Sequence, residues 1–421
     1  MSVVNPSARS DVSGVPGAEP LTERQVFLFS ALCCLVYFTS YVTRYNYGAA
    51  IPELVNSLNL SNQQVSMGVL GSFVTYGAGQ LIFGILGDRF EPRSMIFAGL
   101  ALSALCNTSI ALTNSIYAMA FIWSCNGLSQ AMIWPPLLRI MARTLSAESY
   151  RKASVGVVAA SSVGTIAVYL FVPLCIWMSG WRLSFALPAV FGLAAAFVWF
   201  FGVKRFARRA DTREVESLAE QPFANVRSII FAVGLLPIFC VIVFQGALRD
   251  GIATWMPSYI HDVFQFGTSV SILSGAVLPI FTIFSITLTN WVYRLVRNEL
   301  RCAAYLWAVG FAASVALLFM FSSSAAVTVL LMAIMSGCMH GVNLMLISIF
   351  PLRFKKYGRI STVSGILNAL TYLGSALSAY GIAALSDHFG WKQTVLSWAV
   401  LSFLGMAMCT ASVKHRKQEW Q

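Results

Sequence analysis

Twelve apolar segments, each long enough to cross the hydrocarbon core of a bilayer, recur along this chain of 421 residues. About 20 apolar residues in a helix span that core of roughly 30 Å, where every backbone amide needs a partner within the helix. In agreement, 57% of the residues are hydrophobic and only 10% are charged. We therefore predict an all-α membrane protein with transmembrane helices at 26–51, 63–87, 94–113, 116–138, 154–178, 183–203, 228–256, 268–290, 302–321, 325–350, 361–385 and 393–413.

Most of the basic residues fall on one side of this helix pattern. If the helices alternate in direction, 24 of the 28 lysines and arginines lie on the side of the two tails, and only Arg182 and Lys392 lie opposite. Positively charged loops stay in the cytoplasm. Both termini are therefore predicted to be cytoplasmic, in a multi-pass protein of the cell membrane, and we expect a bacterial inner membrane. Because the net charge of +12 has this explanation, no nucleic-acid partner is expected.

An internal repeat divides the chain around its one long polar stretch. Six predicted helices precede this stretch and six follow it. Two pairs of matching motifs stand 205 and 210 residues apart: Arg44 with Pro52 and Arg249 with Pro257, then Gly180-Trp181-Arg182 and Gly390-Trp391-Lys392. The predicted organisation is a cytoplasmic tail at 1–25, a six-helix half at 26–203, a cytoplasmic linker at 204–227, a second six-helix half at 228–413 and a tail at 414–421.

The turn after the second helix adds a recognisable motif. Gly84 is followed by Asp88 and Arg89, and then by Arg93. Two six-helix halves with a Gly-x-x-x-Asp-Arg turn resemble the major facilitator superfamily, although Glu91 stands where that motif often has glycine. The resemblance implies two pseudo-symmetric six-helix halves. It also implies that Asp88, Arg89 and Arg93 pair at a cytoplasmic gate, where charges complement helix ends; a solvated loop is the alternative.

Two arginines, Arg44 and Arg249, lie inside predicted membrane spans. A charge at that depth costs at least about 2.5–3.5 kcal/mol on insertion scales, so such residues usually face a cavity with a partner. Tyr37 and Tyr41 lie seven and three residues before Arg44, on the same helical face. By the repeat, the two guanidinium groups face each other across one cavity, and an anion such as phosphate or carboxylate fits between them. Pairing with a buried acid, for which only Asp250 is placed, and snorkelling toward the membrane surface are the alternatives.

A narrower resemblance rests on longer stretches around these residues. They are Tyr41-Val42-Thr43-Arg44-Tyr45-Asn46, Leu248-Arg249-Asp250-Gly251-Ile252 and, as the most specific one, Gln130 with Trp134-Pro135-Pro136. Together they resemble the organophosphate:phosphate antiporter family over residues 25 to 413. The resemblance implies that Arg44 and Arg249 clamp the phosphoryl group of the substrate, and that tyrosines line its path: Tyr37, Tyr41, Tyr76 and Tyr372.

Several positions depart from that family's pattern. A histidine that helps to bind phosphate is replaced by Ser161, a cavity lysine by Gln80, and a lysine–acid pair by Tyr45 and Thr254, whereas Asp250 is added. The predicted cavity is therefore less positive than in a phosphate-ester carrier. A monoanion, a carboxylate or a larger organic anion becomes a candidate substrate beside phosphate esters.

Two further titratable residues are candidates for coupling. Asp250 either carries a proton or forms a structural or gating pair, and direct pairing with Arg249 is not assured because adjacent residues point about 100° apart on a helix. His340, with Asn343 near the same face, either contacts substrate or proton or completes a polar packing network.

The sequence thus predicts a secondary active transporter of a small organic anion that works by alternating access. No ATP-binding or nucleophile motif is present, so the chain is not expected to be an enzyme, and we expect no cofactor, no metal and a monomer. Inorganic phosphate or a proton is the candidate second species. A proton- or sodium-coupled anion symporter is one alternative. A transporter-like membrane sensor of a phosphorylated metabolite, which signals to a partner, is another.

Overall fold

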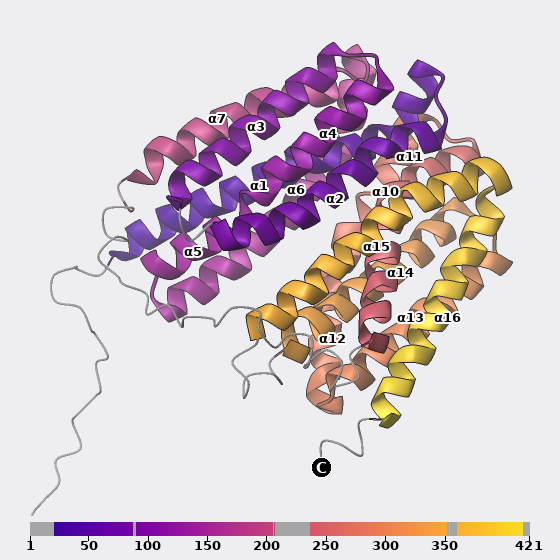
Figure 1. Ribbon diagram of the computed structural model, residues 1–421. Coiled ribbons are helices and arrows are strands. Elements are labelled where there is room, and N and C mark those ends of the chain that lie inside the picture. The colour runs from indigo at the N-terminus through magenta and orange to yellow at the C-terminus, as the bar shows by residue number, and fades with distance from the viewer. Residues whose placement is uncertain are drawn as a thin grey trace, which may run out of the picture.

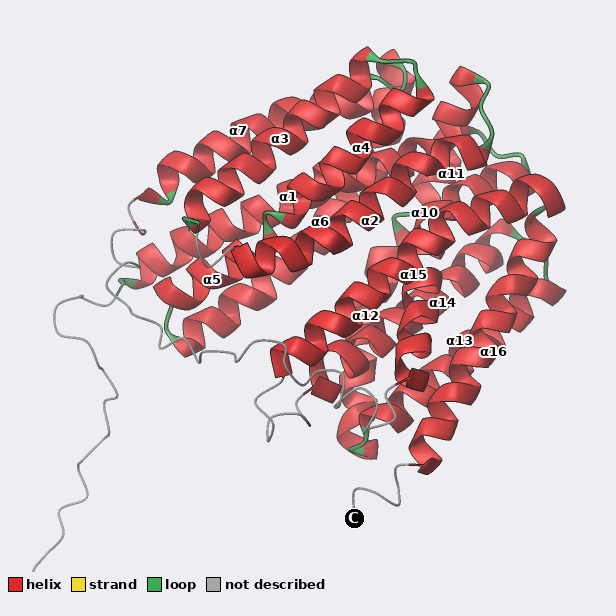
Figure 2. Ribbon diagram, viewed as in Figure 1, coloured by secondary structure: helices red, strands yellow, loops and turns green. Residues whose placement is uncertain are grey.

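The structure is a computed structural model that describes residues 21–86, 90–204, 206, 236–351, 353 and 360–415. Every regular element within these ranges is a helix, as Figure 2 shows, and the predicted all-α fold is confirmed. Most of the predicted linker, the outer parts of both tails, and the gate residues Asp88 and Arg89 lie outside the described residues.

The first half of the chain contains a broken helix. Two short helices replace the single predicted span at 116–138, with Met132 and Ile133 between them. Pro135 and Pro136 follow this break, and a proline has no N–H to donate to the preceding turn. The described elements are α1 (Glu23–Leu58), α2 (Asn62–Leu86), α3 (Pro92–Leu112), α4 (Ile116–Ala131), α5 (Trp134–Thr144), α6 (Ala147–Ser179) and α7 (Leu183–Gly202).

The second half repeats this pattern with interruptions elsewhere. Gly275 and Ala276 separate α11 from α12, and α14 passes into a π-helix, η1. The elements are α10 (Leu236–Phe264), α11 (Thr268–Ser274), α12 (Val277–Val296), α13 (Glu299–Phe319), α14 (Ala325–Asn343), η1 (Leu344–Ile349), α15 (Ile360–Phe389) and α16 (Trp391–His415). Eleven helical segments of the described chain are long and apolar enough to span a membrane. The broken α4–α5 span is the twelfth.

Two helices, α1 and α10, end several residues beyond their predicted ends. The first span was expected to end at residue 51 and the seventh at 256, but α1 continues to Leu58 and α10 to Phe264. Each helix continues past an internal proline, Pro52 or Pro257. Proline is tolerated in transmembrane helices because neighbouring helices and side chains satisfy the freed backbone groups. The two prolines therefore do not end the helices.

The repeated Gly-Trp motif adopts the same local structure in both halves. Gly180 follows α6 with φ +79°, and Gly390 follows α15 with φ +82°. Glycine adopts this left-handed region without a Cβ clash, so it permits the tight turn into the next helix. Trp181 and Trp391 are buried directly after these turns. The same turn at corresponding places supports the pseudo-symmetry of the halves.

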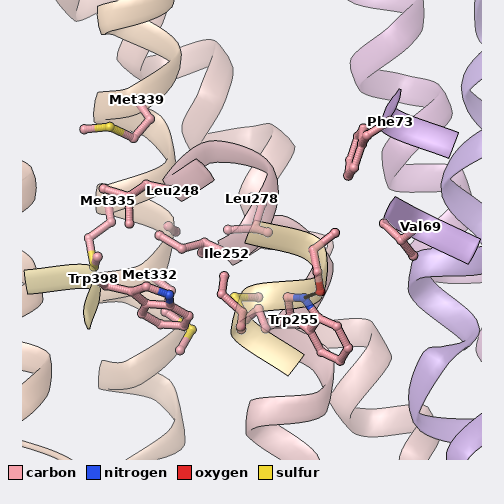
Figure 3. Packing of buried hydrophobic residues seen from close by; sticks show 14 of the residues in the cluster. Val69, Phe73, Leu248, Ile252, Trp255, Leu278, Met332, Met335, Met339 and Trp398 are labelled. Atoms are coloured by element: carbon pink, nitrogen blue, oxygen red, sulfur yellow. Dashed lines mark hydrogen bonds between the residues drawn. The ribbon is translucent and has the colours of Figure 1, made fainter. Parts of the chain in front are cut away.

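The two halves form two helical bundles that lie side by side, as Figure 1 shows. They meet mainly where α2 packs along α15 and where α6 packs against α11 and α12. Gly77 of α2 and Gly275 beside α11 permit close approach, because a Cβ at either would crowd Tyr372 or Tyr169 of the facing half. A continuous apolar cluster crosses this interface; Figure 3 shows part of it, with Val69, Phe73, Leu248, Ile252, Trp255, Leu278, Met332, Met335, Met339 and Trp398.

Hydrogen bonds between the halves gather at one end of the molecule, where α1 turns into α2. Asp387 of α15 accepts hydrogen bonds from the Asn62 side chain at 3.1 Å and the Gln63 backbone amide at 2.7 Å. Asn56 contacts His261 at 3.1 Å. Tyr169, nearer the centre, donates to the Ala253 carbonyl at 3.1 Å. Within the described ranges, no hydrogen bond or salt bridge joins the halves at the opposite end, where α7 ends and α10 begins.

Candidate functional site

A cavity of about 250 Å³ lies between the two halves, with walls from α1 and α6 on one side and α10, α12, α14 and α15 on the other. Most of the predicted site residues line it, and so do several that were not predicted. The predicted ones are Tyr41, Arg44, Ser161, Arg249, Asp250, His340, Asn343 and Tyr372. The additional polar and aromatic ones are Tyr45, Ser162, Thr165, Tyr169, Thr282 and Ser336.

Arg44 lies against aromatic rings. Its guanidinium carbon is 3.8 Å from the centroid of the Tyr76 ring, 5.7 Å from that of Tyr45 and 5.8 Å from that of Tyr372. A cation over an aromatic face is attracted by the ring quadrupole, by about 0.5–2 kcal/mol. No carboxylate of the described residues forms a salt bridge with Arg44. The guanidinium therefore keeps its positive charge and its hydrogen-bond donors available to the cavity.

Arg249 has a carboxylate partner. Its Nε and Nη2 donate to Oδ1 and Oδ2 of Asp250 at 2.8 and 2.7 Å, a bidentate pair. The Asp250 carboxylate also accepts from the Ser375 hydroxyl at 2.6 Å, which ties α10 to α15. Arg249 and Asp250 therefore pair directly, although two adjacent residues of a helix point in different directions and their pairing was not certain from the sequence. The alternative of an ion pair with a buried acid therefore holds for Arg249, whereas no acid of the described residues pairs with Arg44.

A buried polar network supports the backbone beside Arg44. Gln130 of α4 donates from Nε2 to the Thr43 hydroxyl at 2.9 Å and to the Ser103 hydroxyl at 2.8 Å, and it accepts from Ser40 at 2.5 Å. Asn126 donates to the Thr43 carbonyl at 3.1 Å. These bonds join α1, α3 and α4. Gln130, the first residue of the Gln-x-x-x-Trp-Pro-Pro stretch, thus holds the segment of α1 that carries Arg44.

Two of the predicted tyrosines lie behind the cavity wall. Tyr37 packs its ring against Tyr41 and Trp134, with centroids 5.1 and 4.7 Å away. Tyr76 lies between the Arg44 guanidinium and Tyr372, whose ring centroid is 4.8 Å from its own. Neither lines the cavity. Tyr76 therefore contacts Arg44, whereas Tyr37 contacts Tyr41 and Trp134.

The remaining polar candidates differ in how their groups are satisfied. The Ser161 hydroxyl donates to the Val158 carbonyl of its own helix at 2.6 Å. The side-chain amide nitrogens of Asn343 and Gln80 are both buried, and neither has a hydrogen-bond partner among the described residues. Unpaired buried donors are costly, so Asn343, which lines the cavity, is the candidate donor to a bound molecule.

Among the predicted gate residues, Arg93 lies within the described part. Its Nε donates to the Phe200 carbonyl at 2.9 Å, and its guanidinium carbon lies 3.8 Å from the Phe200 ring centroid. Both contacts join α3 to α7 within the first half. The pairing of Arg93 with Asp88 and Arg89 stays a prediction.

Tyr45 and Tyr169 line the cavity but were not predicted as site residues. Tyr45 stacks on Tyr41 with a centroid distance of 5.1 Å. A signal for Tyr169 existed in the sequence: with Ser162 and Thr165 it falls at intervals of three and four residues, on one face of α6.

Two helical halves around a central polar cavity define a multi-pass membrane protein with the architecture of a secondary transporter. The sequence profile of the Major Facilitator Superfamily matches residues 33–379, and the chain belongs to this superfamily. It is therefore a membrane transporter and not an enzyme, as the sequence predicts.

Comparison with individual proteins places the chain among distant relatives. It is 21% identical to a probable hexose phosphate transport protein of Chlamydia trachomatis, over 87% of this chain and 86% of the relative. It is 23% identical to the glycerol-3-phosphate transporter of Bacillus subtilis, over 88% and 89%. These matches confirm the resemblance to the organophosphate:phosphate antiporter family. In fold, it matches a bacterial homologue of the human lysosomal transporter Spinster with a TM-score of 0.74 and 14% identity, over 94% of this chain and 98% of that chain.

Proposed function

We propose that the protein moves a small organic anion, of the organophosphate or carboxylate type, across the membrane by alternating access. The observation that carries this proposal is an arginine, Arg44, in a cavity between the halves without an acid partner among the described residues. A charge away from water is costly without a counter-ion. An anionic substrate supplies that counter-ion, and it brings Arg44 and Arg249 into contact with one molecule.

The names of the relatives favour a phosphorylated substrate. Two of them are described as carriers of hexose phosphate and glycerol 3-phosphate. A guanidinium group donates to phosphate or carboxylate oxygens in a planar fork. Exchange for inorganic phosphate is the coupling that this relationship favours. Because Asp250 and His340 line the same cavity, proton-coupled symport is the second candidate.

The contacts between the halves suggest the direction in which the cavity opens. With both termini in the cytoplasm of a bacterial cell, the end where α1 turns into α2 faces outward. The hydrogen bonds of Asp387 with Asn62 and Gln63 close that end. They must break before a substrate enters from outside, and they form again when the halves rock back.

Uptake into liposomes tests the site. Purified protein is reconstituted into vesicles loaded with phosphate, and uptake of labelled glycerol 3-phosphate, glucose 6-phosphate and gluconate is followed. Loss of one partner of a buried charge contact costs about 2–5 kcal/mol, so we expect Arg44→Ala and Arg249→Ala to lower uptake at least about 30-fold. Glu53→Gln, which removes a carboxylate from α1 outside the cavity, serves as the control. Uptake by Arg44→Ala at the wild-type rate would contradict the proposal.

The coupling is tested with the same vesicles. Antiport requires phosphate inside, whereas symport continues without it and stops when the proton gradient is dissipated. If Asp250 carries the proton, uptake by Asp250→Asn no longer depends on the gradient. Uptake by this variant that still collapses with the gradient excludes Asp250 as the carrier.

A further inference from the structure

The fixed charges of the central cavity do not cancel. Among the described residues, two arginines and one carboxylate line it, and His340 is the only other titratable lining residue apart from the tyrosines. With His340 neutral, one positive charge remains. Arg249 and Asp250 form a bidentate ion pair whose charges cancel, so the remaining positive charge is that of Arg44.

Asp250 belongs to the wall of the binding region and is not a distant structural residue. Its carboxylate is 9% exposed and lies in the central cavity with Arg44 and Arg249. Arg44 and Asp250 also both line a smaller cavity of about 40 Å³ with Gly48, Ser72 and Trp123. An anion bound at Arg44 therefore lies in the field of the Asp250 carboxylate.

A bound anion of single charge would neutralise this cavity, whereas a dianion would leave one negative charge uncompensated. The interaction of two unit charges at a given separation is about fourfold stronger at an effective dielectric constant of 20 than in water. Asp250 repels the second negative charge of a dianion, and it already occupies the Nε and Nη2 of Arg249 as hydrogen-bond donors.

We propose that Asp250 determines the charge of the substrate: as a built-in counter-ion of Arg249, it makes the site select singly charged organic anions over doubly charged ones. The selected class comprises monocarboxylates and phosphodiesters, and it disfavours dicarboxylates and fully ionised phosphate monoesters. This inference rests on the proposed function, because it concerns the same cavity.

Pairs of anions with nearly the same skeleton and different charge test the inference. Gluconate and glucarate carry one and two carboxylates, and both are fully ionised near neutral pH because carboxylic acids have pKa values of about 4. Glucose 6-phosphate is mostly a dianion there, since its second pKa is about 6, whereas its methyl diester is a monoanion. Dissociation constants are measured by calorimetry on purified protein. We expect wild-type protein to bind the monoanion of each pair at least about tenfold more tightly.

Three variants separate charge from structure. In Asp250→Asn the cavity gains one positive charge, and we expect the ratio of affinities to shift toward the dianion by about tenfold or more. Ser375→Ala removes the hydrogen bond that holds the carboxylate but keeps its charge, so the ratio should stay within about twofold. Glu53→Gln removes a carboxylate elsewhere and should leave the ratio unchanged.

The inference fails if wild-type protein binds the dianion of both pairs more tightly, or if Asp250→Asn leaves the ratio unchanged. It also fails if Ser375→Ala shifts the ratio as far as Asp250→Asn does, because the carboxylate would then act only as a structural brace. Should Asp250→Asn not fold, the wild-type ratios decide. In each of these cases the proposed function stands if binding still requires Arg44. Binding of all four anions that survives in Arg44→Ala, or no binding at all, overturns the proposed function and this inference together.

Discussion

Arg44 and Arg249 occupy corresponding positions in the two halves, eight residues before Pro52 and Pro257, yet their surroundings differ. Arg44 lies on the rings of Tyr76, Tyr45 and Tyr372, and amides and hydroxyl groups hold the backbone next to it. Arg249 is bound by the carboxylate that follows it in the chain. The repeat thus preserves the arginine and the proline but not the net charge. Within the described part of the chain, one half offers a cation without an acid partner, and the other offers a neutral pair.

The largest effect that this comparison predicts is on stability. Removing one partner of a buried ion pair costs about 3–5 kcal/mol, because the other charge stays buried alone. We therefore expect Arg249→Ala to lower the melting temperature of the purified protein substantially. The double variant Arg249→Ala/Asp250→Ala should recover most of the loss, whereas Arg44→Ala, which has no acid partner among the described residues, should melt close to the wild type. Equal melting temperatures for the two single variants would remove the distinction between the arginines.

A second prediction concerns the network that holds Arg44. Gln130→Ala deletes hydrogen bonds to Ser40, Thr43 and Ser103 and leaves their hydroxyl groups buried. The Thr43 and Ser103 hydroxyl groups still donate to the Thr39 carbonyl and to Asn126, whereas the Ser40 hydroxyl is left without a partner among the described residues. An orphaned buried group costs about 1–3 kcal/mol, so both the melting temperature and the affinity for the anion should fall. Gln393→Ala, at an exposed position of α16, is the matched control. An unchanged affinity in Gln130→Ala would show that the Arg44 segment does not need this support.

The sequence predicted the fold better than it predicted the side-chain contacts. Helix number follows from the apolar runs, and both arginines could be placed at membrane depth. The pairing of Arg249 with Asp250 could not be predicted from the sequence, because it depends on two side-chain rotamers. Tyr37 shares a helical face with Arg44, but seven residues rise about 10.5 Å along the axis, which puts it behind the cavity wall. Periodicity gives the face of a helix and not the depth at which a cavity ends.

The hydrogen bonds at the end where α1 turns into α2 lead to a third prediction. The Asp387 carboxylate of α15 lies at the first turn of α2, where a negative charge is favoured by about 0.3–1 kcal/mol. Asp387→Asn removes this charge and weakens the hydrogen bond with the Gln63 amide. Closure of the halves at this end should become less stable by a similar amount. Hydrogen–deuterium exchange at the start of α2 should rise about two- to fivefold, while exchange in α3 and α4 stays unchanged. Slower exchange at the start of α2, or faster exchange in all three helices, would contradict a local closing role.

The last prediction compares two tyrosines on one face of α1. Tyr41 lines the cavity and Tyr37 packs behind it on Trp134. A neutral hydrogen bond contributes about 0.5–1.5 kcal/mol, so if the Tyr41 hydroxyl contacts the anion, Tyr41→Phe should weaken its binding by about two- to tenfold. Tyr37→Phe keeps the ring contacts and should change the dissociation constant less than about twofold. A larger effect of Tyr37→Phe than of Tyr41→Phe would mean that the bound anion extends past Tyr41 toward the end where α7 ends. The neutral pair of Arg249 and Asp250 would then be too far away to set its charge.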